Sequence, residues 1–336
     1  MKRIKLSAIW TIAIFVAICP SAFAWNPAGH MAIARAAFEQ LDKPRQQQLV
    51  TILKEHPRFA ADFTAVMPQD LSPEEQDRWI FERAAVWPDV ARNLPTEDQL
   101  KYNRPGWHYI DVPVYLDEEA KQKIQPPPFD FSYPTSVHEP ALNAVQALKK
   151  SVAELNNPKT PAPQKAVALC WVLHLAGDLH QPLHGAALFS AGRFRQLPMG
   201  DKGGNDILVH DPNGMIQPPM KQNLHSLWDS MLGTDASPAA VKTLADTVLA
   251  STPKDSVAEQ LKQTQIEDWA RESNAAAVKA VYTPEILELV KANESHPHTP
   301  LPTFEITDDY LKQARPVAQT RAALASYRTA WLLSGN

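Results

Sequence analysis

Hydrophobic residues recur three and four positions apart along most of the chain, with polar residues between them. This spacing predicts amphipathic α-helices because it places the apolar side chains on one face. The first predicted helix opens at Asn26-Pro27, where asparagine suits the cap and proline suits the first position. The predicted helices cover residues 26–40, 43–55, 72–85, 138–155, 163–184, 222–233, 238–250, 255–280, 283–294 and 307–334. The pattern therefore predicts an all-α fold.

Two regions depart from the helical pattern. Residues 112–137 are rich in proline and predict a long surface loop, and residues 190–220 are rich in glycine and proline. Within the second region, the apolar segments 207–210 and 215–217 flank an Asn-Gly pair, which predicts a small β-hairpin. Neither region resembles a linker between domains. We therefore expect residues 25–336 to form one mainly helical domain with long loops.

The first 24 residues have the pattern of a secretory signal peptide. Three basic residues open the chain, an apolar run follows, and Ala22-Phe23-Ala24 is a typical cleavage site. Cleavage after Ala24 predicts a secreted or periplasmic protein. The apolar run is too short for a stable membrane span, and we expect no membrane anchor. The alternative is a lipoprotein with Cys19 as the lipid acceptor, although the bulky Ile18 before it is unusual for one.

Charge and cysteine content narrow the expected chemistry. The full chain has a net charge of −4, and removal of the signal peptide would leave 30 basic and 37 acidic residues. Such a surface attracts nucleic acid poorly unless bound cations add local positive charge. Cys19 would leave with the signal peptide, so Cys170 alone would remain and no internal disulfide could form. We expect Cys170 to be a buried apolar residue rather than a zinc ligand or reactive thiol.

Histidine and aspartate at helical spacing are the clearest chemical signal. His174 and Asp178 are four residues apart, so they share one helix face, and His225 and Asp229 repeat the spacing. His184 follows the first pair closely. Imidazole and carboxylate are ligands that zinc takes without cysteine. Two such pairs predict a site that holds several metal ions.

Further candidate ligands stand beside large aromatic residues that could shield a site from water. Asp89 follows Trp87-Pro88, and His108 follows Trp107. The histidines expected at the site are His30, His108, His174, His184 and His225. The other six are expected at the surface or beside the ligands: His56, His138, His180, His210, His296 and His298. A supporting role is the alternative for His180, which lies between candidate ligands.

The order of these motifs resembles the S1/P1 family of secreted zinc-dependent single-strand nucleases. The shared features span residues 25–230: Trp25 with His30, Trp-Pro-Asp-x-x-Arg (Asp89 and Arg92), His-Tyr-Ile-Asp (His108 to Asp111), Gly-Asp-x-His-Gln-Pro-Leu-His (177–184), Gly203-Gly204-Asn205, and His225-x-x-x-Asp229. The resemblance implies a mainly helical fold of the phospholipase C/P1 nuclease type. The absence of an internal disulfide is closest to bacterial-type members.

The resemblance also implies three Zn²⁺ ions per chain and a set of ligands for each. The first ion would be held by Asp89, His108, His174 and Asp178. Its neighbour would be held by the α-amine and carbonyl of Trp25, by His30 and by Asp178, which bridges the pair. The third ion would be held by His184, His225 and Asp229. An α-amine has a pKa of about 7.7–8.0, so zinc can displace its proton near neutral pH.

The implied reaction is hydrolysis of phosphodiesters in single-stranded DNA and RNA. A hydroxide between the paired ions would attack phosphorus, and the third ion would stabilise the leaving 3′-oxygen. Products would end in 5′-phosphate, and 3′-nucleotides would lose their phosphate in the same way. Arg92, oriented by Asp111, would stabilise the phosphate, Tyr109 would stack on a base, and Asn205 would bond to a base edge. A monomer is expected.

Two other functions are weighed against this one. Zinc phospholipases C of related fold also use an N-terminal Trp and three zinc ions, but they typically carry Glu where this chain has Asp229 and lack the Gly-Gly-Asn loop. The second alternative is a periplasmic zinc-binding protein without catalysis. Exposed histidine-rich tracts would be expected in such a protein, and only His296-Pro297-His298 resembles one.

Overall fold

The computed structural model describes residues 25–125, 131 and 142–335. The predicted signal peptide, Cys19, His138 and the start of the helix predicted at 138–155 lie outside these residues. Across the described part of the chain, none of the helices has both the length and the apolar character needed to cross a membrane.

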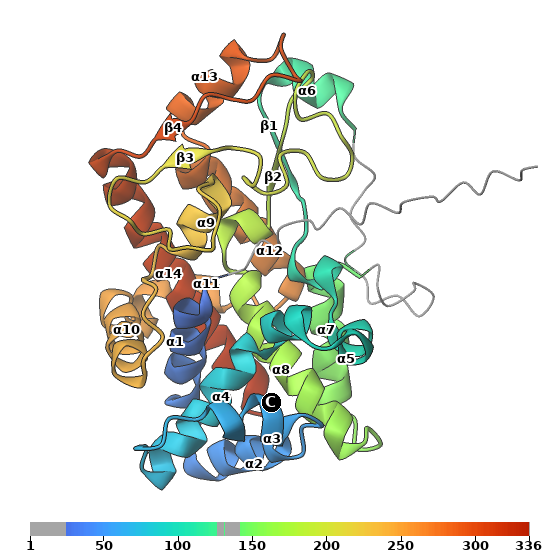
Figure 1. The fold of residues 1–336 in the computed structure, drawn as a ribbon, viewed down its shortest axis with the longest axis vertical. Coiled ribbons are helices and arrows are strands. Elements are labelled where there is room, and N and C mark those ends of the chain that lie inside the picture. Colours follow the sequence, from blue (N-terminus) through green and yellow to red (C-terminus); the bar gives the residue numbers. More distant parts are fainter. Residues whose placement is uncertain (1–24, 126–130, 132–141, 336) are drawn as a thin grey trace, which may run out of the picture.

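Helices make up most of the described chain, which confirms the all-α prediction (Figure 1). The longer ones are α1 (Pro27–Phe38), α2 (Lys43–Lys54), α4 (Pro73–Val90), α7 (Ala144–Asn156), α8 (Ala162–Asp178), α10 (Pro238–Ser251), α12 (Ile266–Ala276), α13 (Pro284–Ala292) and α14 (Asp308–Leu333). The shorter ones are α3 (Phe59–Asp62), α5 (Thr96–Tyr102), α6 (Glu118–Lys123), α9 (Leu224–Asp229) and α11 (Ala258–Leu261). Single turns of tighter or wider helix are η1 (Thr64–Val66), η2 (Ala91–Asn93), η3 (Pro105–His108), η5 (Pro182–His184), η6 (Lys254–Val257) and η7 (Ala277–Val281).

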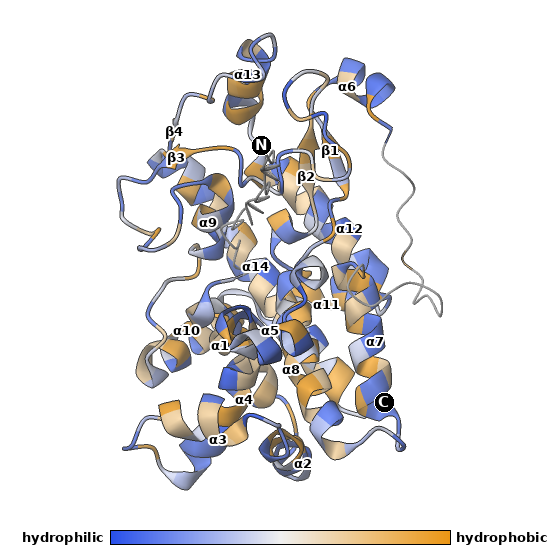
Figure 2. Cartoon of the chain, turned by 45° about the vertical axis from the view of Figure 1, so that its right-hand side comes forward, coloured by the Kyte–Doolittle hydropathy of each residue, from blue (hydrophilic) through white to orange (hydrophobic). Residues whose placement is uncertain are grey.

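Helix α8 runs through the middle of the helical body. It contacts α1, α2, α4, α7 and α14, and its residues from Ala168 to Asp178 are all buried. A helix that is apolar on every side is buried on every side, and Figure 2 shows the predominance of hydrophobic residues along it. The side chains that project from its last two turns are therefore shielded from water.

Prolines stand near the ends of α8 and α4, the two helices that carry the candidate ligands Asp178 and Asp89. Helix α8 ends at Asp178 because the ring of Pro182 would clash with the Asp178 carbonyl if the helix continued. The prediction of one helix over 163–184 is therefore wrong at its end, where a turn and η5 follow. Helix α4 instead continues through Pro88 to Val90, beyond the predicted end at 85, and so carries Asp89 on its last turn.

The predicted β-hairpin is wrong. Strand β3 (Val209–His210) pairs in parallel with β4 (Phe304–Glu305), not with residues 215–217. Strand β1 (Pro113–Tyr115) pairs in parallel with β2 (Ala187–Phe189), so the predicted loop over 112–137 contains both a strand and α6. The helix predicted over 255–280 is interrupted and forms η6, α11, α12 and η7.

The hydrophobic core consists of two large clusters of buried side chains. One joins α1, α2, α4, α7 and α8, with Phe81, Trp87 and Leu169 among its members. The other joins α9, α13 and α14 with the strands and includes Trp25 and Trp228. Helix α1 contributes residues to both clusters. The end of α8 and the start of α1 therefore meet the α9 region, and the candidate ligands converge there.

Candidate metal centre

Eight of the nine predicted ligands come together in three buried groups. The groups are His30, His174 and Asp178; Asp89, His108 and His174; and His184, His225 and Asp229. Within each group the candidate ligand atoms lie within 4.8 Å of one another. Helices α1, α4, α8 and α9 and the turns η3 and η5 each contribute at least one side chain.

Asp178 belongs to the first group and also contacts His108 of the second group. Its Oδ1 is 3.3 Å from Nε2 of His30. Its Oδ2 is 3.2 Å from Nδ1 of His108 and 3.3 Å from Nε2 of His174. The two oxygens of one carboxylate therefore face different histidines. This is the arrangement expected of a residue shared between two ions.

The third group is fixed by hydrogen bonds to backbone carbonyls. Nδ1 of His184 donates to the carbonyl of His108 at 2.6 Å, and Nδ1 of His225 donates to the carbonyl of Gly203 at 2.7 Å. A carbonyl only accepts, so these bonds place the proton of each neutral ring on Nδ1. The two Nε2 atoms then face each other with lone pairs at 3.1 Å. Nε2 of His225 also lies 3.5 Å from Oδ2 of Asp229.

His174 shows the same arrangement beside Pro88. Nδ1 of His174 donates to the carbonyl of Ala85 at 2.7 Å, so its Nε2 lone pair faces Nδ1 of His108 at 2.9 Å. Pro88 has no N–H for the carbonyl one turn before it, so the helix ladder is interrupted next to Ala85. The buried ring of His174 stacks on His30 with centroids 4.1 Å apart.

Burial makes the charged forms of these side chains unfavourable, and a bound cation would offset that cost. Burial raises the pKa of Asp89, Asp178 and Asp229, and it lowers the pKa of His174 to about 3. Three carboxylates buried together cost free energy unless cations or donors compensate them. Several polar atoms also lack hydrogen bonds: Nδ1 and Nε2 of His30, Oδ2 of Asp89, Nε2 of His108, Oδ1 of Asp178 and Oδ2 of Asp229. The residues present fit a metal centre.

Two glycines allow the ligand-bearing segments to approach closely. A Cβ on Gly177 would lie 2.9 Å from Nδ1 of His30, so a side chain there would separate α8 from α1. Gly203 has a φ of +60°, and a Cβ there would lie 2.4 Å from the carbonyl oxygen of Leu183. The conformation of Gly203 presents its own carbonyl to His225.

Trp25, the ninth predicted ligand, lies beside the groups. Its side chain is fully buried, and Nε1 donates to the carbonyl of Gly177 at 3.1 Å. The next residue, Asn26, donates its backbone N–H to the carbonyl of Asp229 at 3.1 Å. The backbone at residues 25–26 therefore lies next to candidate ligands of two groups.

Arg92 contacts the centre, whereas Asp111 has different surroundings. Nη2 of Arg92 forms an ion pair with Oδ1 of Asp89 at 2.9 Å. Asp111 is buried, and burial together with the charge of Asp201 raises its pKa to about 8. The predicted role of Asp111 in orienting Arg92 therefore rests on the resemblance alone.

The two predicted base-contacting residues differ in accessibility. Tyr109 is 41% exposed although its neighbour His108 is buried. The Asn205 side chain accepts a hydrogen bond from Nδ2 of Asn223 at 3.1 Å. Asn223 in turn caps α9 by accepting from the backbone of Ser226. Asn205 thus supports the helix that carries His225 and Asp229.

Two supporting residues were not predicted. Gln181 donates from Nε2 to Oδ1 of Asp229 at 2.6 Å and so holds a candidate ligand. Asp201 accepts from the backbone of Leu188 at 2.8 Å and from the Tyr282 hydroxyl at 2.9 Å, which anchors the loop that contains Gly203. Gln181 lies inside the predicted motif, but its partner is 48 residues away and spacing alone gives no signal of it.

The remaining histidines are divided between surface and core. His210, His296 and His298 are exposed. His180 is buried, with Nδ1 donating to the carbonyl of Ala176 and Nε2 accepting from Arg328. His56 is also buried, against Trp87, and so it is neither at the surface nor beside the ligands. Cys170 is a buried free thiol, as predicted.

Comparison with known proteins points to one family. A family model described as S1/P1 nuclease matches residues 25–335. Endonuclease 3 of Arabidopsis thaliana is 25% identical over 233 residues, which cover 67% of this chain and 60% of that protein. Endonuclease 4 of the same organism is 22% identical over 341 residues, which cover 96% of this chain and 92% of that protein. The chain thus spans less than two thirds of the first relative and nearly all of the second.

Proposed function

The chain belongs to the S1/P1 nuclease family, and we propose that it is a zinc-dependent endonuclease acting on single-stranded DNA and RNA. The products would carry 5′-phosphates, and 3′-nucleotides would be dephosphorylated at the same site. The mature protein would begin at Trp25, form one domain, and act as a monomer after export through a cleaved signal peptide.

The observation that carries this proposal is the pair of Nε2 lone pairs held 3.1 Å apart on His184 and His225. Two such nitrogens turned towards one point are placed as two ligands of one ion would be. Two donors on one tetrahedral zinc, with bonds of about 2.0–2.1 Å, lie roughly 3.3 Å apart. The contacts of Asp178 at 3.2 and 3.3 Å support the same interpretation.

The donor set favours zinc over calcium or magnesium. Imidazole nitrogen supplies five of the eight buried candidate ligand residues, whereas calcium and magnesium are bound mainly by oxygen. When bound, zinc lowers the pKa of water to about 7 and stabilises negative charge on phosphate oxygens.

The protein's own residues would position the substrate. Asp178 presents one oxygen to each of two neighbouring groups and so fixes their separation. Arg92 carries a permanent positive charge beside Asp89, where it can bond to a phosphate through two N–H groups. Tyr109, which is 41% exposed beside His108, would stack on an unpaired base, and this contact would favour single strands over duplexes.

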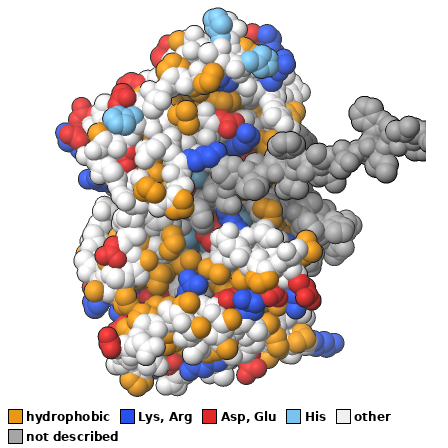
Figure 3. All heavy atoms as spheres, in the orientation of Figure 1, with side chains coloured by type: hydrophobic (Ala, Val, Ile, Leu, Met, Phe, Trp, Pro, Cys, Tyr) orange, Lys and Arg blue, Asp and Glu red, His pale blue; other side chains and the backbone are white. Residues whose placement is uncertain are grey.

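Local charge must attract the substrate because the overall surface does not. On the face shown in Figure 3, acidic and basic side chains are interspersed among hydrophobic and neutral ones. A chain with net charge −4 offers little long-range attraction to nucleic acid. Bound cations and Arg92 would supply that attraction at the centre itself.

The proposed N-terminus would complete the ligand set. In a chain that begins at Trp25, the α-amine would lie beside His30 and Asp178, because the Trp25 ring already bonds to Gly177. Signal removal would then be a step in assembling the metal centre.

The test is a comparison of substrates with zinc-loaded protein that begins at Trp25. We expect release of acid-soluble nucleotides from single-stranded DNA and RNA, and no release of phosphocholine from phosphatidylcholine. Tyr109→Ala should weaken single-stranded DNA binding by about 1–3 kcal/mol. Phosphocholine release without nucleotide release would instead indicate a phospholipase. Zinc binding without either activity would indicate a non-catalytic zinc protein.

A further inference from the structure

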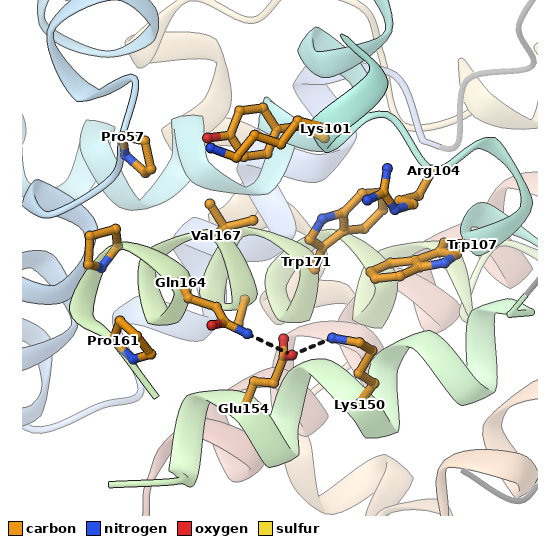
Figure 4. A pocket seen from close by; sticks show the side chains of 13 residues that line it. Pro57, Lys101, Arg104, Trp107, Lys150, Glu154, Pro161, Gln164, Val167 and Trp171 are labelled. Atoms are coloured by element: carbon orange, nitrogen blue, oxygen red, sulfur yellow. Dashed lines mark hydrogen bonds and ion pairs between the residues drawn. The ribbon is translucent and has the colours of Figure 1, made fainter. Parts of the chain in front are cut away.

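A cavity lies beside the metal centre, next to Trp171, whose ring also contacts that of His108. Its volume is about 390 Å³, it is open to solvent on one side, and most of its lining comes from α5, η3, α7 and α8. Figure 4 shows the side chains around it. Those that matter most are Lys101, Arg104, Trp107, Lys150, Glu154 and Trp171. None of the residues that line it is a candidate metal ligand.

Positive charge is held along the wall of this cavity by aromatic rings. Nζ of Lys101 lies 5.0 Å from the centre of the Tyr102 ring. The Arg104 guanidinium carbon and Nζ of Lys150 lie 5.9 Å and 5.8 Å from the centre of the Trp107 ring. Such contacts hold a cation in place without neutralising it. The cavity therefore presents preorganised positive charge.

One carboxylate accompanies the three cations. Glu154 pairs with Lys150 and also accepts a hydrogen bond from Nε2 of Gln164 at 2.9 Å (Figure 4). The lining thus carries a net charge of about +2 in a chain whose net charge is −4. An anion is the ligand that this balance favours.

Two tryptophans separate the cavity from the metal centre. Trp107 and Trp171 both line the cavity, and the centroids of their rings are 4.8 Å apart. On the other side, the Trp171 ring lies 5.4 Å from that of His108 and 6.2 Å from that of His174. The two sites are therefore adjacent, with a single layer of indole rings between them.

We propose that this cavity binds one nucleoside monophosphate. Arg104 would hold the phosphate, Lys101 would add positive charge at the end of the cavity near Tyr102, and the base would lie against the edges of the indole rings (Figure 4). Glu154 and Gln164 offer acceptors and donors to a base edge. The volume lies within the range of about 300–1,000 Å³ typical of small-ligand sites and suits one nucleotide rather than a strand. The choice of a nucleotide rests on the proposed function, because 5′-mononucleotides are its final products.

The test is calorimetric titration of zinc-loaded protein with adenosine 5′-monophosphate. The double variant Lys101→Glu/Arg104→Glu reverses two cavity charges, and Lys242→Glu/Lys312→Glu makes the same charge change on exposed residues of α10 and α14. Both proteins retain the metal centre, so the difference between them isolates the cavity. We expect one binding event to weaken at least about tenfold in the cavity variant and to remain within about twofold of wild type in the control.

A second variant and two further ligands make the result decisive. Val167→Phe fills the cavity without changing charge and should remove the same binding event, including where the double variant fails to fold. Adenosine and inorganic phosphate should each bind there at least about tenfold more weakly than the nucleotide. Equal nucleotide binding by wild type and both cavity variants would overturn the proposal, and so would equally tight binding of bare phosphate. Single-stranded DNA hydrolysis, measured on the same samples, tests the proposed function separately.

Discussion

Buried charged groups lie on both sides of the turn that follows α8. Their charge is balanced in a different way on each side. On one side, Asp178 and His184 lie among other imidazoles and carboxylates, and Oδ1 of Asp178 lacks a hydrogen bond. On the other side, Arg321 and Arg328 of α14 meet Glu272 of α12 at 2.6–2.8 Å. The first side fits a cation from solution, whereas the second side supplies its own counter-charge.

The arginine side also holds the backbone of the turn. Nε of Arg321 donates to the carbonyl of His180, and Nη1 of Arg328 donates to Nε2 of His180. Burial pushes the pKa of Glu272 upward, but the hydrogen bonds and charges of Arg328 and Arg321 outweigh burial and lower it. These bonds anchor the turn through residues that are not candidate metal ligands.

The largest expected effect is on metal content and hydrolysis rate, on the side of the turn that carries Asp178 and His184. Asp178→Asn removes the carboxylate that faces two groups, so we expect loss of metal and a fall of roughly 10³-fold or more in the rate of single-stranded DNA hydrolysis. The control is Asp246→Asn, which removes an exposed carboxylate paired with Lys242. Metal content by mass spectrometry and the initial rate give the result. A variant with wild-type metal content and rate would show that Asp178 is not a ligand.

On the arginine side the expected effect is on stability. Glu272→Gln leaves two buried guanidinium groups without their anion, and we expect a loss of about 3 kcal/mol in the free energy of unfolding. Metal content at saturating zinc should stay unchanged. Glu259→Gln, at an exposed pair with Lys262, is the matched control. Loss of metal from Glu272→Gln at full stability would mean that the two sides are not separate in function.

His56 provides a third case, a buried imidazole beside neither a metal group nor a buried arginine. Burial lowers its pKa from 6.5 to about 4, so the unfolded chain binds a proton more readily than the folded protein between these values. Stability from this residue is present above pH 6.5 and is lost as the pH falls towards 4, by about 2 kcal/mol between pH 7 and 5. Chemical denaturation at both pH values, with and without His56→Asn, measures it. An identical pH slope in the two proteins would contradict this assignment.

The smallest expected effect concerns a residue that supports a ligand. Gln181→Ala removes the hydrogen bond to Asp229 and should weaken zinc binding at the third group by about tenfold. Competition with a chelator measures the affinity of each ion. Exposed Gln217→Ala should leave every affinity unchanged. If Gln181→Ala also leaves all affinities unchanged, Asp229 is held by the fold alone.

The sequence was sufficient to predict most helices and most of the residues that converge in the candidate centre, for identifiable reasons. His174 and Asp178 share a helix face because of the helical repeat, and the Asn26-Pro27 start is local. The end of α8 could not be placed from periodicity because the apolar pattern continues past Pro182. The path of α4 through Pro88 could not be predicted because its environment, including the contact of Ala85 with His174, comes from a helix 89 residues away.

The other features that could not be predicted depend on partners that are far apart in the sequence. The parallel pairing of β3 with β4 joins residues almost 100 positions apart, and a local turn signal favoured a hairpin instead. Glu272, Arg321 and Arg328 carry no motif, and they appear as a site only once α12 and α14 lie beside the turn. Residues that act through a ligand are therefore harder to predict than the ligands themselves.

The most direct test is a zinc count on two forms of the protein, one that begins at Trp25 and one extended by a single residue. The account predicts three zinc ions and full single-stranded DNA hydrolysis for the first form. The extended form should hold two ions and lose most activity, because its α-amine no longer lies beside His30 and Asp178. Equal zinc content and equal rates in the two forms would contradict the proposed centre.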